Sequence, residues 1–265
     1  MKRIAILLAW LAMSSCEYIE YHPYQTSVSG KTGINARNCE KITANCEGRS
    51  QIRFVFMTDT QRWYDQTLDA VKAINALDSI DFVILGGDMS DFGLRKEFCL
   101  MRDIFEKLDV PYVSLIGNHD CIGTGEEVFR KIFGDTDFAF TAGDTRFICL
   151  NTNALEYDYS TDIPNMRFIE SQVEDMPSDI RRTVAVMHVR PMAEEFNNNL
   201  SRPFHMTLKR AVGLEFCLFG HEHKMIEQEL FDDGIPYIGC TCIEDREFLL
   251  FDINRDGYEY RKVTF

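Results

Sequence analysis

Polar residues of the kinds that bind metal ions or transfer protons stand directly after apolar runs of this chain. The motif Gly-Asn-His-Asp at 117–120 follows the largely apolar run 113–116, and Gly-His-Glu-His at 220–223 follows the run 214–219. An apolar run that stops at such residues indicates a buried strand that presents amide, imidazole and carboxylate groups at its tip. One tip alone is more often a turn, so the chemistry depends on how many strands end in this way.

Five runs end in this way, and their polar residues are the usual donors of a metal site. Burying these polar groups together without hydrogen-bond partners would cost free energy, whereas shared cations would satisfy all of them. We therefore expect a metal centre where the tips meet at one edge of a sheet. The candidate donors are Asp59 with Gln61, Asp88, Asn118 with His119, His188, and His221 with His223.

The elements that position these tips are predicted from hydrophobic periodicity. Three strand–loop–helix units in succession imply parallel strands with right-handed crossovers, whose carboxyl ends lie along one edge where ligands bind. In these units the strands are expected at 52–57, 82–85 and 112–116, and the helices at 63–77 and 94–108. Later strands are expected at 137–141, 145–150, 183–187, 214–219, 225–230, 237–242, 248–253 and 258–264, helices at 126–133 and 166–173, and loops at 151–165 and 193–204.

Composition limits the classes of partner. The chain has 265 residues, 45% of them hydrophobic, which suffices for a large core. It carries 28 Lys and Arg against 42 Asp and Glu, a formal charge of -14. A surface this acidic argues against binding nucleic acid or anionic lipid headgroups, so an anionic substrate would need local cations such as bound metal ions or placed Arg residues.

The N-terminus has the features of an export signal. A basic start precedes ten apolar residues, too few to span a bilayer, and the run ends in Met-Ser-Ser-Cys at 13–16. This ending resembles a bacterial lipobox, with Met13 where Leu is preferred. We expect a signal peptide over 1–15, lipidation at Cys16, and a protein of the bacterial cell envelope that is anchored by this lipid and faces the periplasm or the cell surface.

Residues 16–50 are predicted to form a tether and a short helix at 35–43 with Asn35 as its N-cap, before a domain at 51–265. Eight cysteines remain after Cys16, and none shows the repeated spacing of a structural zinc site. Cysteines inside apolar runs are expected to be buried thiols. Cys39 and Cys46 are the pair most expected to form a disulfide, because export permits one.

The order of the motifs resembles the calcineurin-like metallophosphoesterase family. It runs Asp-x-Gln, Gly-Gly-Asp-x-x-Asp, Gly-Asn-His-Asp, His, Gly-His-x-His, and the match extends from about Phe54 to His223. The resemblance implies a four-layer α/β/β/α sandwich of two mixed β-sheets flanked by helices, with the later strands in the second sheet. It also implies a hydrolase that cleaves a phosphomonoester or a phosphodiester by attack of a hydroxide bridging two metal ions.

Roles carried over from the family assign each motif a task. One ion would be held by Asp59, Gln61, Asp88 and His223, and the other by Asn118, His188 and His221, with Asp88 shared. His119 would act on the phosphoryl or leaving oxygen, and Asp120 would orient it. Asn118 is also an expected substrate contact. Arg190, two residues past His188, either reaches a phosphate oxygen or is a surface residue beside Pro191. Trp63 and Tyr64 either pack as helix residues or stack on a leaving group.

Two divalent ions would keep this cleft positive, since the two carboxylates offset only half of their charge. The family most often has His where Gln61 stands. An amide oxygen is a harder and weaker donor than imidazole, so we expect looser binding and a preference for Mn²⁺ or Fe²⁺, with Zn²⁺ also able to bind.

Two alternatives stay open: a hydrolase of pyrophosphate bonds in nucleotide-sugar-like substrates, and a non-catalytic binding scaffold. The partner expected is a phosphate-ester small molecule, a nucleotide among the options, with no nucleic acid and with membrane contact only through the N-terminal lipid. The sequence does not predict the oligomeric state.

Overall fold

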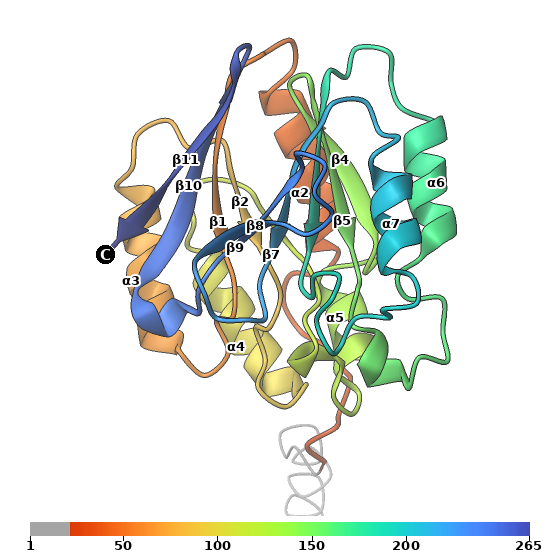
Figure 1. Cartoon of the computed structure of the whole chain (residues 1–265). Coiled ribbons are helices and arrows are strands. Elements are labelled where there is room, and N and C mark those ends of the chain that lie inside the picture. The colour runs from red at the N-terminus through yellow and green to blue at the C-terminus, as the bar shows by residue number, and fades with distance from the viewer. Residues whose placement is uncertain (1–21) are drawn as a thin grey trace, which may run out of the picture.

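Two β-sheets face each other in the computed structural model, which describes residues 22–265, and helices cover their outer sides (Figure 1). The expected signal peptide and Cys16 lie outside the described residues. Among the residues described, no helix is both long and apolar enough to cross a membrane. The architecture is the predicted four-layer α/β/β/α sandwich, and both sheets are mixed.

The first sheet contains the three strand–loop–helix units, as predicted. Its parallel strands β1, β2 and β3 are joined by α3 and α4, which lie on its outer face (Figure 1). The bounds are β1 Ile52–Met57, α3 Tyr64–Asn75, β2 Phe82–Leu85, α4 Arg95–Phe105 and β3 Tyr112–Ser114.

The last two strands correct one expectation. β10 (Glu247–Asn254) pairs antiparallel with β1, and β11 (Gly257–Thr264) pairs with β10, so both extend the first sheet rather than the second. Strand periodicity does not encode which sheet a strand joins, because any apolar strand edge offers the same backbone partners.

The second sheet has the order β4-β5-β6-β7-β9-β8. Its outer face is covered by α6 and by α7 (Ser201–Leu208), which lies partly where a loop was predicted and buries Phe204 and Leu208. The other bounds are α5 Gly125–Ile132, β4 Phe138–Ala142, β5 Thr145–Leu150, α6 Met166–Glu174, β6 Arg182–Met187, β7 Leu214–Phe219, β8 Ile226–Glu229 and β9 Pro236–Gly239, with short 3₁₀ turns η2 His119–Cys121, η3 Ala154–Tyr157 and η4 Ile243–Asp245.

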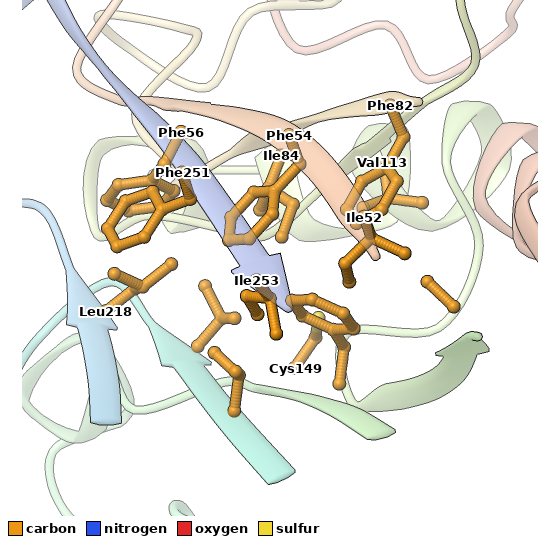
Figure 2. Close-up of a cluster of buried hydrophobic side chains, with 14 of the residues drawn as sticks. Ile52, Phe54, Phe56, Phe82, Ile84, Val113, Cys149, Leu218, Phe251 and Ile253 are labelled. Carbon is orange, nitrogen blue, oxygen red and sulfur yellow. The ribbon is translucent and has the colours of Figure 1, made fainter. Parts of the chain in front are cut away.

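The core between the sheets is built on phenylalanine rings (Figure 2). Phe54 stacks on Phe82 and Phe251 at centroid distances of 5.2 and 4.9 Å, and it meets Phe147 of the facing sheet edge-on at 5.3 Å. The helices bury the other faces, which is why these strands are apolar along their whole length rather than alternating. Each buried Phe contributes about 1.5–3 kcal/mol, so this core holds the strand ends in fixed positions.

α2 (Ile34–Asn45) closes one side of the sandwich by bridging the edge strands of the two sheets. Asn38 donates to the Tyr112 carbonyl of β3 at 2.7 Å, and Thr43 donates to the Thr141 carbonyl of β4 at 2.8 Å. Asn35 is not the N-cap that was predicted, since it lies inside the helix and pairs with both backbone groups of Ser114. Side-chain amides thus satisfy backbone groups that an edge strand would otherwise leave open.

The predicted Cys39–Cys46 disulfide is wrong, because all eight cysteines of the described residues are free thiols. Both residues belong to α2 and its C-terminal cap. Seven residues of helix separate their Cα atoms by about 10 Å, beyond the roughly 7 Å that a disulfide spans. Cys46 is fully buried and packs in the core between the sheets as a small apolar side chain.

Candidate metal centre

The loops that follow β1, β2, β3, β6 and β7 converge on one site between the two sheets. Backbone hydrogen bonds tie these loops together: Gln61 N–H donates to the Asp88 carbonyl at 3.0 Å, and Gly220 N–H donates to the His188 carbonyl at 3.0 Å. We expected all the tips to lie at the edge of one sheet, but they come from both sheets. The facing of two sheets brings β6 and β7 opposite β1 and β2.

Two buried carboxylates and one imidazole form the centre of the site. One donor atom each from Asp59, Asp88 and His188 lies within 4.8 Å of the others, and all three side chains are at most 1% exposed. Burial lowers the pKa of His188, but the charge of Asp88 outweighs it and raises that pKa to about 10. Two carboxylates at this depth require positive charge nearby, from imidazolium protons or from metal ions.

Asn118 links the two sheets at this centre. Its Oδ1 lies 3.1 Å from His188 Nε2 and 3.0 Å from His221 Nδ1. One amide oxygen facing two imidazole nitrogens is an arrangement that a shared cation would satisfy.

Asp59 is held from several sides. His223 Nε2 lies 3.0 Å from Oδ1, while Oδ2 accepts hydrogen bonds from the Thr58 hydroxyl at 2.7 Å and from the His221 N–H at 3.1 Å. Burial opposes ionisation, but the hydrogen bond with His223 and the charge of His188 outweigh it and lower the pKa of Asp59. Asp59 is therefore an anion fixed in orientation, as a metal ligand must be.

Gln61 gives a direct test of whether a metal fits. Its side chain is 4% exposed, and its Oε1 has no hydrogen-bond partner within residues 22–265. An unpaired buried amide oxygen costs about 1–3 kcal/mol. It is satisfied if it binds a cation, so the residues present fit the metal ions that the motifs imply.

The backbone at the site is strained. Asp59, Asp88, His221 and His223 have φ angles of 54°, 54°, 67° and 52°, a region that side-chain-bearing residues adopt infrequently. Strain of this kind costs roughly 1–3 kcal/mol per residue and concentrates at functional sites. Gly117 adds a packing constraint, since a Cβ there would lie 2.1 Å from Asp88 Oδ1.

His119 lies at the start of η2 with its ring oriented by backbone. Its N–H donates to Asp88 Oδ1 at 3.0 Å, and its Nδ1 lies 3.0 Å from the Asp91 carbonyl oxygen. A carbonyl accepts only, so Nδ1 carries a proton, and Nε2 is the nitrogen that can face a substrate.

Asp120 was expected to orient His119, but in the structure its carboxylate binds other groups. The Asp120 carboxylate instead accepts from Ser90 N–H and Oγ at 2.8 Å each, from Met89 N–H at 3.1 Å and from Gly117 N–H at 3.0 Å. Burial and the nearby charge of Asp88 raise the pKa of Asp120 to about 7. Asp120 thus joins the loops after β2 and β3, because backbone N–H groups of both loops point at it.

Arg190 is engaged by the protein. Its guanidinium pairs with Glu222 at 2.6 Å and donates to the Pro191 carbonyl at 2.9 Å. This pair joins the loops that carry His188 and His221, so a contact with substrate would have to share the guanidinium with Glu222. Trp63 and Tyr64 pack against the core on the outer face of the first sheet, which supports the packing alternative.

One residue that the sequence did not indicate is Glu195. Its Oε2 lies 2.8 Å from His221 Nε2 and so leaves Nδ1 of that ring facing Asn118. Glu195 belongs to a loop without a motif, and only the folded chain brings it to His221. His205, in contrast, lies outside the site and contacts Asp233 and Tyr237.

A two-sheet sandwich with oxygen and imidazole donors on these loops is the arrangement that the order of the motifs implied. The sequence model of the calcineurin-like phosphoesterases matches residues 52–225, and the chain belongs to this family. The family uses divalent metal ions, and Asp59, Asp88 and His188 form a candidate site for one.

Individual relatives are distant. A probable cyclic nucleotide phosphodiesterase of Xenorhabdus bovienii is 28% identical over 72 residues, which cover 27% of this chain and 29% of that protein. GAP50, the anchor in the inner membrane complex of Plasmodium, has a TM-score of 0.62 at 14% identity, covering 82% of this chain and 85% of that one. The purple acid phosphatase PPD1 of yellow lupin seeds has a TM-score of 0.60 at 14% identity, over 82% of this chain and 52% of that one. Likeness at this identity concerns the fold.

Proposed function

We propose that this protein is a metal-dependent phosphohydrolase that cleaves a phosphomonoester or a phosphodiester. The observation that supports it best is the full set of donors around two buried carboxylates, including the unpaired Gln61 oxygen, beside a backbone-oriented His119. Asp59, Gln61, Asp88 and His223 would hold one ion, and Asn118, His188 and His221 the other, with Asp88 shared. Two such ions would lower the pKa of a bound water and neutralise phosphoryl oxygens.

His119 would supply the proton for the leaving group. Because Nδ1–H is committed to the Asp91 carbonyl, a proton on Nε2 makes the ring an imidazolium. As water adds to phosphorus and the ester P–O bond breaks, the leaving oxygen takes the proton from Nε2.

The fit to divalent ions extends to their identity. Gln61 offers oxygen where imidazole is usual in the family, so Mn²⁺ or Fe²⁺ is favoured over Zn²⁺. The expected export signal and Cys16 would place this activity in the cell envelope, where phosphate esters are encountered outside the cytoplasm.

A binding scaffold is the second candidate, since a neighbour of the same fold is described as an anchor. A scaffold has no need to keep strained donors and an unpaired Gln61, so the donor set favours the enzyme. Cleavage of pyrophosphate bonds would use the same site and differs only in the leaving group.

The test is elemental analysis of the purified full chain, followed by assays with p-nitrophenyl phosphate, bis-p-nitrophenyl phosphate and a nucleotide-sugar in the presence of Mn²⁺ or Fe²⁺. We expect bound metal and turnover, and a His119→Ala variant that keeps the metal and loses turnover by about 10²–10⁴-fold. Absence of both metal and turnover would establish the scaffold instead, and turnover of the nucleotide-sugar alone would establish the pyrophosphatase.

A further inference from the structure

Five large apolar side chains that are exposed lie on loops that carry the candidate metal centre or on segments that pack against those loops. Within residues 22–265, eight large apolar side chains are exposed. Three of them, Leu100, Met206 and Val212, lie elsewhere, on α4, on α7 and before β7. Exposed apolar side chains are ordinary when scattered but mark a binding surface when they cluster. The five near the centre, here named the apolar rim, are Tyr24, Phe92, Leu155, Tyr159 and Met192, which are 37–58% exposed.

Two members of the apolar rim are attached to the loops that carry His119. Phe92 directly follows Asp91, whose carbonyl contacts the His119 ring. Tyr24 packs its ring against Gly123, and its carbonyl accepts from the Thr124 hydroxyl at 3.1 Å, just past η2.

The other three belong to the loops after β5 and β6. Leu155 N–H donates to the Glu195 carbonyl at 3.0 Å, and the Tyr159 hydroxyl donates to the Glu194 carbonyl at 3.0 Å, so the two loops form one unit. Met192 lies four residues after His188, and its N–H donates to Asn198 Oδ1 at 2.9 Å. The Glu195 side chain of this unit reaches His221, which fixes the unit beside the metal centre.

Two of these exposed side chains are held in unfavourable conformations. Tyr159 and Met192 have φ angles of 54° and 72°. Such angles cost roughly 1–3 kcal/mol each and persist where function requires a particular placement. Burial of these side chains in the core does not account for the strain, because 45% and 52% of their surfaces are exposed.

Negative charge beside the apolar rim restricts which ligands the rim would bind. Glu195 contacts His221, and Glu156 stands between Leu155 and Tyr157 in the paired loop. Carboxylates disfavour a substrate with several phosphate groups but tolerate one phosphoryl group at the metal ions. Leu155 and Met192 are aliphatic and match an alkyl chain, whereas the polar edge of a nucleobase would need hydrogen-bond partners.

The start of the described chain lies at this same end. Tyr24 rests on the turn that precedes α5, and Lys131 of α5 contacts Thr26 at 3.1 Å, next to the first described residues (Figure 1). Five residues lie between His22 and the expected lipid at Cys16, so the connection could reach at most about 20 Å. Such a lipid would hold the apolar rim close to a membrane, where amphiphilic phosphate esters reside.

We propose that the apolar rim binds the alkyl chain of an amphiphilic phosphoester, so that the substrate is a lipid-like ester with a single phosphoryl group. This assignment rests on the proposed phosphohydrolase function. In the reaction, the oxygen of water bonds to phosphorus, the bond from phosphorus to the leaving oxygen breaks, and that oxygen takes up a proton.

The test compares p-nitrophenyl methyl phosphate with p-nitrophenyl decyl phosphate, hydrolysed by the full chain with Mn²⁺ below the concentration at which the decyl ester forms micelles. The two esters share the leaving group and differ by nine methylenes. Each methylene fully buried is worth about fourfold in binding, so contact with two or three predicts a ratio of kcat/KM, decyl over methyl, of about 15–60.

Matched double variants locate the effect. Phe92→Ser with Met192→Ser is expected to lower this ratio to below about 5, and Phe92→Leu with Met192→Leu to keep most of it. Leu100→Ser with Val212→Ser removes apolar side chains that are 44% and 47% exposed and lie away from the site, and it is expected to preserve the ratio.

The outcomes separate the two proposals. If neither diester is hydrolysed while p-nitrophenyl phosphate is, the alkyl-site proposal fails, and if p-nitrophenyl phosphate is not hydrolysed either, the phosphohydrolase proposal fails. If the methyl ester is hydrolysed but the decyl ester is not preferred, or if both serine variants lower the ratio equally, the apolar rim is not an alkyl site. If thymidine 5′-p-nitrophenyl phosphate is preferred to the decyl ester and the preference depends on Phe92 and Met192, the ligand is a nucleoside and the lipid assignment is overturned.

Discussion

Replacing Asp120 decides whether this carboxylate acts in the reaction or holds the site together. Asp120 is fully buried and accepts four hydrogen bonds at 2.8–3.1 Å, from Met89, Ser90 and Gly117. In Asp120→Asn, the amide oxygen can keep the donors at Oδ1, but the amide NH₂ then faces the Gly117 N–H. One charge-assisted bond is lost and two donors oppose each other.

The loss of that bond and the unsatisfied donor together cost about 2–4 kcal/mol, and removal of a buried charge beside Asp88 recovers part of it. We therefore expect Asp120→Asn to lower the free energy of unfolding by about 2 kcal/mol, and Asp120→Ala, which leaves all four donors unpaired, by about 4 kcal/mol. Ser90→Ala removes one donor and is expected to cost about 1 kcal/mol.

The measurement is urea unfolding of metal-free protein at pH 8, beside the turnover of the metal-loaded protein. His119→Ala serves as the contrast, because its part-buried ring is expected to affect turnover far more than unfolding. Our structural reasoning is refuted if the free energy of unfolding of Asp120→Asn lies within about 0.5 kcal/mol of the parent value while turnover is abolished. Asp120 would then act in the reaction, as the sequence predicted.

Three further changes test the site and the fold. Gln61→His should raise the affinity for one metal ion and shift the metal preference toward Zn²⁺. Calorimetric titration measures both, and identical isotherms for the variant and the parent would contradict the role of the amide oxygen. Glu195→Ala should weaken metal affinity about 10–100-fold by freeing the His221 ring, with Glu195→Gln retaining most of it; equal affinity in all three proteins would show that the contact is incidental. Burial raises the pKa of Asp137 to about 6, so its carboxylate opposes folding and stability should fall by at most about 2 kcal/mol as pH rises from about 4 to 6. Urea midpoints across this range should be flatter for Asp137→Asn, and an unchanged profile would exclude this group as the cause.

The sequence by itself determined most of the elements and the chemistry of their tips. Strand and helix periods, and the turn residues between them, are local properties, so β1, β2 and β5 to β7 were found close to their bounds. The donor types were readable for the same reason, since each is adjacent to its strand. The exceptions among the elements, such as α7, gain stability mainly from packing on a sheet that has to form first.

Only the tertiary structure decided which residues meet. It placed β10 and β11 in the first sheet, gave Asp120 to the Met89, Ser90 and Gly117 backbone rather than to His119, and brought Glu195 to His221. Apart from the contact of Asp120 with Gly117, the side-chain pairings join residues far apart along the chain, and a carboxylate binds whichever donors the fold presents to it. The reason is physical: hydrophobic periodicity fixes local conformation, whereas side-chain partners are set by how the two sheets pack.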